Sequence, residues 1–335
     1  MFGRKCIFFT VLVLFAFLPV VSVSASPGYA FEVFRPNGTK YSVSSIVDIY
    51  FENVTSGEVY ANESMDINFN FTFISKRIDL KHIGWGFILE LPEEAVNETN
   101  FPNKISVPPL LAVEEGSRRI YFPQVLFDLI EGRISDVGEA LKNVFFSKIN
   151  KSFYILNPFY ISKDVKIGDK VDYGFWYVKR DTGYIVNGEV KEKVKINIAG
   201  LEIETWRVEI QVSNLTEVLD VVSEMFNVTL FENDTEAKNV IGNITITANL
   251  YYDTKIGWLT KANITAHLNP EAIPEDVTGH AQASITLNLL DFGALNIGGK
   301  GIVFRLIGIP DEALLISDIV IIALIVITII RRRRA

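Results

Sequence analysis

The sequence predicts a mainly β protein, with antiparallel curved sheets or a sandwich and a few covering helices, between an N-terminal signal and one C-terminal transmembrane helix. Three observations support this prediction. Apolar and polar residues alternate over long stretches, as they do in half-buried strands. Turn residues separate these stretches. Helical periodicity is confined to short segments between them.

The first β region includes the alternating stretch from Ala30 to Leu91. Every odd residue from Ile67 to Phe73 is apolar, whereas the residues between them are polar, and the run from Ile83 to Leu89 repeats the pattern. Such alternation, rich in aromatic and β-branched residues, is typical of antiparallel strands with one solvated face. The run Pro36-Asn37-Gly38 indicates a hairpin turn.

Strands return from about Ile161 to Phe292. The stretches Ile244–Tyr252 and Trp258–Leu268 carry an apolar residue at nearly every even position and flank a predicted turn at Asp253–Gly257. A change of parity predicts a β-bulge near Thr205. The even-numbered row is too long and apolar to face water, so we expect helices to cover it.

Three segments are candidates for these helices. Gln124–Ile130 and Ser135–Ile149 lie in a proline-containing connecting region, and Leu215–Phe226 is a short amphipathic segment. Helices that pack tightly on the apolar row would make a closed core, whereas helices that stand off would leave a ligand-sized apolar cavity. Close packing is the commoner arrangement in proteins, which favours the closed core.

Both chain ends are apolar. The positive run Gly3-Arg4-Lys5 precedes an apolar stretch that closes on small residues, the layout of a secretory signal cleaved after Ala25; an uncleaved anchor is the alternative. At the other end, the aliphatic stretch Ala313–Ile330 is interrupted only by Asp318 and is followed by Arg331–Arg334. The arginines predict a cytosolic tail and a single-pass membrane protein with an extracellular ectodomain.

These features divide the chain into seven parts. We expect a signal peptide (1–25), an N-terminal β region (26–100), a helical connecting region (101–160), a C-terminal antiparallel β region (161–300), a stalk (301–312), a transmembrane helix (313–330) and a basic tail (331–335).

Asn-x-Ser/Thr triplets are the strongest internal signal. Chance would give roughly two or three among 23 asparagines, but the chain has eleven. Because an acceptor asparagine must reach a transferase, the excess predicts a glycosylated surface protein. The predicted glycosylation sites are Asn37, Asn53, Asn62, Asn70, Asn97, Asn150, Asn214, Asn227, Asn233, Asn243 and Asn263.

Charge and composition narrow the possible partners. Without Arg4, Lys5, Asp318 and the four terminal arginines, 26 basic and 39 acidic residues give the ectodomain a net charge of −13. Such a surface repels phosphate backbones, so we expect no nucleic-acid partner. The single cysteine, Cys6, lies in the signal, and the scarcity of Cys, Met and Gln beside abundant Ile, Val, Glu and Lys is typical of thermophiles. With the glycosylation signals, this composition indicates an archaeal cell surface.

Two family resemblances add to this interpretation. The stretches Val165–Val171 and Tyr251–Leu259 make the segment 164–290 similar to the curved half-barrels of LolA-like lipoprotein carriers, which implies an apolar ligand. The stretch Ile309–Leu315, with the apolar span and basic end that follow it, resembles an archaeosortase sorting signal, which implies removal of the tail after about Pro310.

Motifs for chemistry are missing from the sequence. It has no Gly-x-Ser-x-Gly elbow, phosphate-binding loop or EF-hand loop. The three histidines lack zinc-site spacing, and the acidic pairs lie in expected loops where solvated acids are ordinary. These residues are His82, His267, His280, Glu93-Glu94 and Glu114-Glu115. We therefore expect no catalytic, cofactor or metal site and no cofactor.

The leading functional hypothesis is a non-enzymatic binding or structural module of the cell envelope. One alternative is a carrier or receptor for an apolar ligand, such as a lipid, in a curved-sheet cavity; another is an envelope hydrolase. The expected partners are membrane lipid around the span and either an envelope protein or an apolar ligand.

Overall fold

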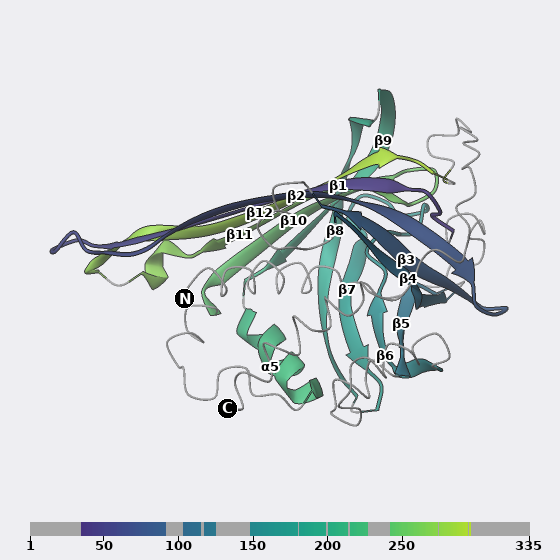
Figure 1. The fold of residues 1–335 in the computed structure, drawn as a ribbon, viewed down its shortest axis with the longest axis horizontal. Helices are drawn as coiled ribbons and strands as arrows, with labels where there is room; N and C mark the ends of the chain where they lie inside the picture. The colour runs from purple at the N-terminus through teal and green to yellow at the C-terminus, as the bar shows by residue number, and fades with distance from the viewer. Residues whose placement is uncertain are drawn as a thin grey trace.

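The structure is a computed structural model that describes residues 35–91, 103–114, 117–124, 148–179, 181–198, 200–213, 215–226, 242–273, 275–293 and 295 (Figure 1). Its strands are β1 (Lys40–Asn53), β2 (Val59–Arg77), β3 (His82–Glu90), β4 (Lys104–Glu114), β5 (Arg119–Pro123), β6 (Ile149–Leu156), β7 (Lys170–Tyr177), β8 (Thr182–Ile198), β9 (Leu201–Val212), β10 (Ile244–Asp253), β11 (Leu259–Leu268) and β12 (Val277–Asp291). The helices are α5 (Leu215–Phe226) and the 3-10 helix η3 (Pro270–Ala272).

All twelve strands form one antiparallel sheet that closes into a barrel. Each strand pairs with its neighbours in sequence, and β1 closes the ring by pairing with β12, from Lys40–Asp291 to Asn53–Val277. The prediction of a mainly β, antiparallel protein is confirmed. The sandwich prediction is wrong, because one continuous sheet encloses the core. The resemblance to LolA-like proteins implied a half-barrel, whereas the pairing of β1 with β12 closes the sheet into a full ring.

The predicted alternation separates the inside of the barrel from the outside. The even row of β10, from Ile244 to Tyr252, is buried, and so are Ala262, Ala266 and Leu268 of β11. The outer face carries exposed cross-strand ion pairs such as Lys170–Glu189 and Lys195–Glu202. Exposed pairs of this kind add only about 0–1 kcal/mol each, so burial of the inner row is the main stabilising contribution of the sheet.

The ends of β1, β2 and β12 extend beyond the rest of the barrel as a long projection (Figure 1). We call this projection the wing; it comprises residues 49–63 and 277–281, which lie past the last pair between β11 and β12. Only Asn70–Arg77 of β2 pair with β3. Among the described residues, the stretch Val59–Phe69 therefore pairs with β1 alone, and its first part forms one edge of the wing.

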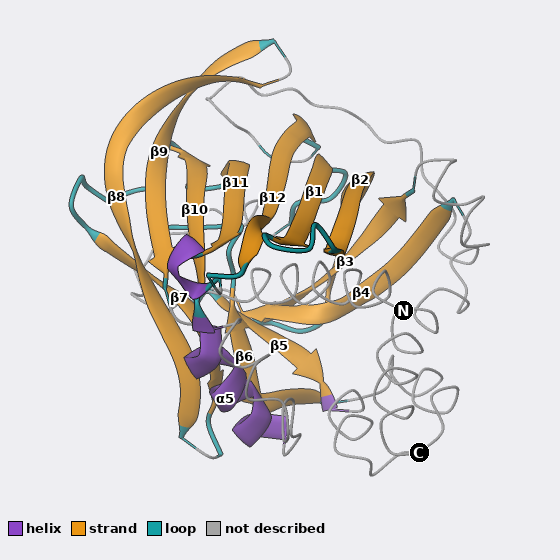
Figure 2. Ribbon diagram, turned by 90° about the vertical axis from the view of Figure 1, so that its left-hand side faces the viewer, coloured by secondary structure: helices purple, strands orange, loops and turns teal. Residues whose placement is uncertain are grey.

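The helix predictions have mixed outcomes. The predicted helix Leu215–Phe226 is confirmed as α5, which lies on the concave side of the sheet and packs against β8 (Figure 2). The end predicted for Ser135–Ile149 is wrong, because Ile149 begins β6 and pairs with Pro123. Residues 135–147 of that segment and residues 125–130 of Gln124–Ile130 lie outside the described residues.

The predicted bulge near Thr205 lies in the neighbouring strand. The register between β8 and β9 shifts between Val190 and Glu192, whereas β9 pairs with β10 without interruption from Val212 to Thr205. A bulge adds a residue to one strand of a pair, and here the added residue belongs to β8.

Both apolar chain ends lie outside the described residues, namely the expected signal (1–25) and the expected stalk, span and tail (301–335). Among the helices that the structure does describe, none is long and apolar enough to cross a membrane.

The connection between β6 and β7 closes one end of the barrel from within. We call residues 157–161 the strap. Its backbone pairs with the turn between β10 and β11: Ile161 N donates to Gly257 O at 2.9 Å, and Leu259 N donates to Phe159 O at 2.8 Å. These bonds satisfy polar backbone groups that would otherwise be buried without partners.

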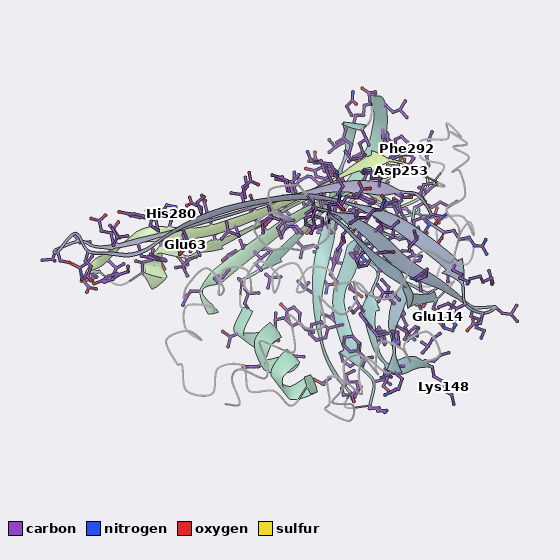
Figure 3. The ribbon with its side chains drawn as sticks, viewed as in Figure 1. Glu63, Glu114, Lys148, Asp253, His280 and Phe292 are labelled. Carbon is purple, nitrogen blue, oxygen red and sulfur yellow. The ribbon has the colours of Figure 1, made fainter. Side chains whose placement is uncertain are left out.

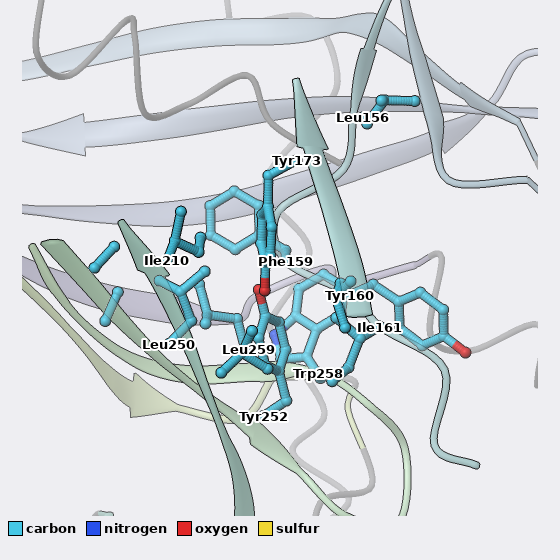
Figure 4. Packing of buried hydrophobic residues seen from close by; sticks show 14 of the residues in the cluster. Leu156, Phe159, Tyr160, Ile161, Tyr173, Ile210, Leu250, Tyr252, Trp258 and Leu259 are labelled. Atoms are coloured by element: carbon cyan, nitrogen blue, oxygen red, sulfur yellow. The ribbon is translucent and has the colours of Figure 1, made fainter. Parts of the chain in front are cut away.

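An aromatic cluster forms around the strap (Figure 4). The Phe159 ring centroid lies 5.0 to 6.4 Å from those of Tyr41, Phe71, Phe73, Trp85 and Trp258. These rings come from β1, β2, β3 and the start of β11. The strap therefore joins opposite sides of the ring, and this end of the barrel is a packed core.

The turn that holds the strap confirms the prediction for Asp253–Gly257. Asp253 Oδ1 accepts from the backbone N–H groups of Lys255 and Ile256 at 2.8 and 2.9 Å. Gly257 has a φ of +73°, and a Cβ atom there would lie 2.0 Å from the carbonyl oxygen of Ile161. Glycine is thus required at position 257 for two reasons: the left-handed backbone conformation and the close approach of the strap.

Replacing this glycine should loosen the strap. Gly200, in the β8–β9 turn, has a similar φ of +78°, but a Cβ atom there would have no neighbour within 4 Å, so it is a matched control. We expect Gly200→Ala to cost about 1–2 kcal/mol from left-handed strain. Gly257→Ala should cost about 1–3 kcal/mol more, because the methyl group meets the strap. Equal losses in urea unfolding would contradict the strap contact.

Candidate functional site

The interior of the barrel is the candidate functional site, because a ring of twelve strands encloses more space than its wall can fill. Eight strands leave an interior just wide enough for side chains, and the diameter grows with the number of strands. The strap fills one end, and α5 covers part of the concave surface on the side of β8. The remaining inner surface decides what the barrel can hold.

Part of the inner wall is only half-buried. Val186 lies opposite buried Tyr173, and Tyr184 lies opposite buried Phe175, so both point inward. Similar positions occur on β2, β3, β5 and β11. We call this set the half-covered wall: Phe69, Phe87, Leu89, Phe122, Tyr184, Val186 and Ile264. The prediction of a closed core therefore holds for the end of the barrel that the strap fills. The half-covered wall instead offers apolar surface to a ligand.

A buried polar cluster lies between the strap and this wall. Arg118 Nη2 donates to the Asn157 carbonyl oxygen at 3.1 Å, and Tyr252 Oη donates to the Pro158 carbonyl oxygen at 2.9 Å. The hydroxyl of Tyr173 points towards that of Tyr252 (Figure 4). All of these side chains are almost fully buried.

Burial keeps the two tyrosines of this cluster protonated. It raises the pKa of Tyr173 well above its ordinary value. It also raises the pKa of Tyr252 to about 12, although the hydrogen bond that Tyr252 accepts from Tyr173 and the positive charge of Arg118 lower that pKa in part. At neutral pH both hydroxyls are therefore hydrogen-bond donors, beside a cation.

Glycine makes room for the tyrosine ring of the cluster. A Cβ atom on Gly188, in β8, would lie 2.3 Å from Tyr173 Cε2 and under 3 Å from side-chain atoms of Val208 and Ile210. The absence of a side chain at Gly188 thus sets the position of Tyr173 against the wall.

The histidines occupy separate places. The His82 ring is buried and its Nδ1 lies 2.8 Å from a carboxylate oxygen of Asp79, whereas His280 on the wing lies 2.9 Å from Asp48. His267 is exposed on the outer face of β11. Figure 3 shows how far the wing, with His280, lies from Glu114. No group of three potential metal ligands occurs among the described residues.

The predicted acidic candidates do not assemble into a site within the described part of the chain. Glu114 ends β4 and accepts from Ser117 Oγ at 2.6 Å and from Tyr121 Oη at 3.1 Å. Burial raises the pKa of its carboxyl, but these bonds outweigh burial and lower the pKa overall. Glu115 and the pair Glu93-Glu94 lie outside the described residues.

The predicted glycosylation sites differ in exposure. Asn37, Asn62 and Asn243 are exposed; Asn53, Asn70 and Asn263 are half-buried; Asn150 is buried; Asn97, Asn214, Asn227 and Asn233 lie outside the described residues. Asn70 and Asn263 have the parity of the outer face, because their neighbours Phe71 and Ile264 belong to the inner face. Their solvent-facing placement agrees with the alternation in sequence.

Sequence reasoning missed the polar cluster entirely. Arg118 precedes β5, Asn157 belongs to the strap, Tyr173 lies on β7 and Tyr252 lies near the end of β10. No short motif links residues so far apart. The one available signal was the run from Asn157 to Ile161, which follows a strand but is as apolar as a core.

Comparisons with known proteins give no family. No family model and no curated protein sequence matches the chain. Among solved structures, a proposed exported protein of Bacteroides fragilis with a YmcC-like fold aligns with 77% of this chain and 99% of its own, at 10% identity and a TM-score of 0.29. A proposed lipoprotein of Parabacteroides distasonis aligns with 77% of this chain and 97% of its own, at 10% identity and a TM-score of 0.26. The hypothetical lipoprotein YmcC of Escherichia coli aligns with 75% of this chain and 84% of its own, at 8% identity and a TM-score of 0.22. At such TM-scores, fold and function rest on the geometry of this chain.

Burial predicts which asparagines carry glycans. The side chain of Asn150 is 6% exposed, and its Oδ1 accepts from Ser152 N at 2.7 Å. We expect glycopeptide mapping of native protein to find Asn37, Asn62 and Asn243 occupied and Asn150 unmodified, because a transferase must reach the amide. High occupancy at Asn150 would contradict its placement in β6.

Proposed function

We propose that this protein is a non-enzymatic binding module of the cell surface that holds an apolar ligand, such as a lipid, inside its barrel. The half-covered wall is the observation that supports this proposal. Seven inward-facing apolar side chains, from Phe69 to Ile264, remain half-buried although neighbouring inner residues are buried. Apolar surface of this kind is stabilised by whatever removes it from water, at about 25 cal/mol per Å².

The chemistry of the interior favours binding over catalysis. Burial raises the pKa of Tyr173 and that of Tyr252 above the ordinary tyrosine value, which makes either hydroxyl a poorer general base. Arg118 supplies a fixed positive charge. These groups can hold and orient a molecule, which is the role of a carrier or receptor.

The location of the module is part of the same proposal. The barrel would lie outside an archaeal cell, with glycans on its outer face. A cleaved signal would direct its export, and the span at 313–330 with the arginine tail at 331–335 would anchor it. The exposed positions of Asn37, Asn62 and Asn243 suit glycans that avoid the interior.

Topology can be tested on intact cells. Added protease should remove the barrel and spare an epitope placed after Arg334, because the arginines remain in the cytosol. Digestion of the epitope from outside would contradict this orientation, and intact mass would show whether the tail is cut near Pro310 instead.

Ligand content can be tested with two neighbouring substitutions on β11. Ile264 belongs to the half-covered wall, whereas Thr265 is exposed on the outer face. We expect full-length protein from its own membrane to carry a stoichiometric lipid in native mass spectrometry. Ile264→Glu should reduce occupancy at least about tenfold, because a carboxylate enters an apolar wall. Thr265→Glu should leave it unchanged.

The comparison also separates the carrier from a structural module. Thermal melting identifies any variant that fails to fold. A folded wild-type protein that never carries a lipid would contradict the carrier and favour the structural role. Equal lipid loss in both variants would place the lipid outside the barrel.

A further inference from the structure

Val59–Phe69 of β2 forms a strand edge that no described strand covers. This stretch pairs with β1 on one side, and β3 begins to pair with β2 only at Asn70. We call it the free edge; its first part runs along the wing (Figure 1). The unpaired backbone groups of a strand edge are a template for pairing with another strand.

Backbone bonds farther along β2 show which residues face the free edge. Phe73 N donates to Thr39 O at 2.8 Å, whereas Ile78 N, on the other side, donates to His82 O at 3.1 Å. Bonding alternates along an antiparallel strand, so the odd residues of β2 bond to β1 and the even residues face away from it. Four even residues in regular register therefore present N–H and C=O groups that no described strand pairs: Asn62, Ser64, Asp66 and Asn68.

Another edge of the barrel is protected against pairing, whereas the free edge is not. Beyond Val190, β8 has no described neighbour on the side of β7, but it carries a bulge there and then three lysines, at 191, 193 and 195. Lysines and bulges on an edge prevent unwanted pairing. The free edge contains no lysine or proline, and its register with β1 is regular from Ala61 to Phe69.

The surface around the free edge is acidic. Residues 46–69 include five carboxylates and no lysine or arginine. One of these carboxylates, Asp48, lies 2.9 Å from His280 Nε2, whereas Glu63 and Asp66 lie on the free edge itself (Figure 3). Opposite charges on neighbouring strands stabilise a pair and like charges destabilise it, so this edge selects a basic strand.

We propose that the free edge binds an extended basic segment of a partner protein, which adds to the sheet as a further strand beside β2. Backbone bonds to the four even residues give the affinity, and lysine or arginine side chains next to Glu63 and Asp66 give the selectivity. A second copy of the chain is a poorer partner, because pairing two free edges brings their carboxylates together. The proposal does not depend on whether the barrel carries a lipid.

Three synthetic peptides of about ten residues separate strand addition from simple charge attraction. One alternates lysine with threonine, the second alternates glutamate with threonine, and the third alternates lysine with proline, which keeps the charge but removes backbone donors. They are offered to full-length glycosylated protein from its own membrane. We expect the lysine–threonine peptide to bind about tenfold or more tightly than either of the others in fluorescence anisotropy, because only it combines opposite charge with a complete row of donors.

Paired variants at one residue test the location. Asp66→Asn keeps the N–H group that faces the free edge, so the affinity for the lysine–threonine peptide should fall only about twofold to fivefold, through lost charge. Asp66→Pro removes that N–H without breaking a bond to β1, so binding should fall at least about tenfold further. Thermal melting confirms that each variant folds.

Val277→Pro is the matched control on the opposite edge of the wing. Val54 N donates to Asp276 O at 2.9 Å, so the N–H of Val277 likewise faces away from β1, but on the side of β12. This variant should leave peptide binding unchanged. Equal losses in Asp66→Pro and Val277→Pro would contradict the assignment to β2.

Hydrogen exchange gives a readout that a damaged fold would not imitate. In free protein, the amides of the four even residues should exchange fast and those of the odd residues between them slowly. The lysine–threonine peptide should slow the four even amides at least about tenfold, because its backbone accepts their hydrogen bonds.

Four other results would overturn the proposal. Slow exchange of the four amides in dilute free protein would mean that another part of this chain covers the edge, and slow exchange only at high protein concentration would assign the edge to a second copy. Equal binding of the lysine–threonine and lysine–proline peptides would reduce the attraction to charge alone. Fast exchange with no binding of any peptide would leave the edge open but exclude a basic strand as its partner.

Discussion

Closing twelve strands into one ring obliges the chain to fill the ring from within, and the rest of the structure depends on how the strap does so. A connecting segment can be buried only if its backbone groups find partners. Residues 157–161 meet this condition through backbone hydrogen bonds to the turn between β10 and β11, where the absence of a side chain on Gly257 leaves room for them. The same bonds place Phe159 among rings from β1, β2 and β3 and the ring of Trp258, just before β11.

The strap thereby divides the interior into two environments. Towards the β10–β11 turn the core is aromatic and dry, with Trp85 and Trp258 almost fully buried. Away from it the wall is apolar but incompletely covered, and the buried cation Arg118 lies near the boundary. The proposed binding site rests on this difference between a packed end and an incompletely covered wall.

Much of the fold could be predicted from local pattern. Periodicity and turn chemistry act over a few residues, and they were enough to predict the apolar rows of β2, β10 and β11, the helix α5 and the Asp253–Gly257 turn. Closure could not, because pairing β1 with β12 depends on strand curvature and register that no local pattern contains. For the same reason the bulge was expected in β9 although its extra residue lies in β8.

The candidate site was less predictable than the fold. The apolar row and its need for a cover were visible in the sequence, whereas Arg118 and Asn157 become neighbours only through the path of the strap. The exposure of the predicted glycosylation sites was also not visible in the sequence, because Asn150 has the same Asn-x-Ser pattern as exposed Asn62 but is buried at the start of β6. A triplet records what a transferase accepts and contains nothing about burial.

The closing pair has a consequence for biogenesis. Because β1 is the first and β12 the last of the described strands along the chain, β1 must wait, with one edge unpaired, until nearly the whole barrel has emerged. Long-range pairing of this kind folds slowly, because the entropy of closing the loop is lost before the contacts form. Folding therefore has a late step, and a chain shortened before Val277 would lose β12, one of the two strands that pair with β1, along its whole length.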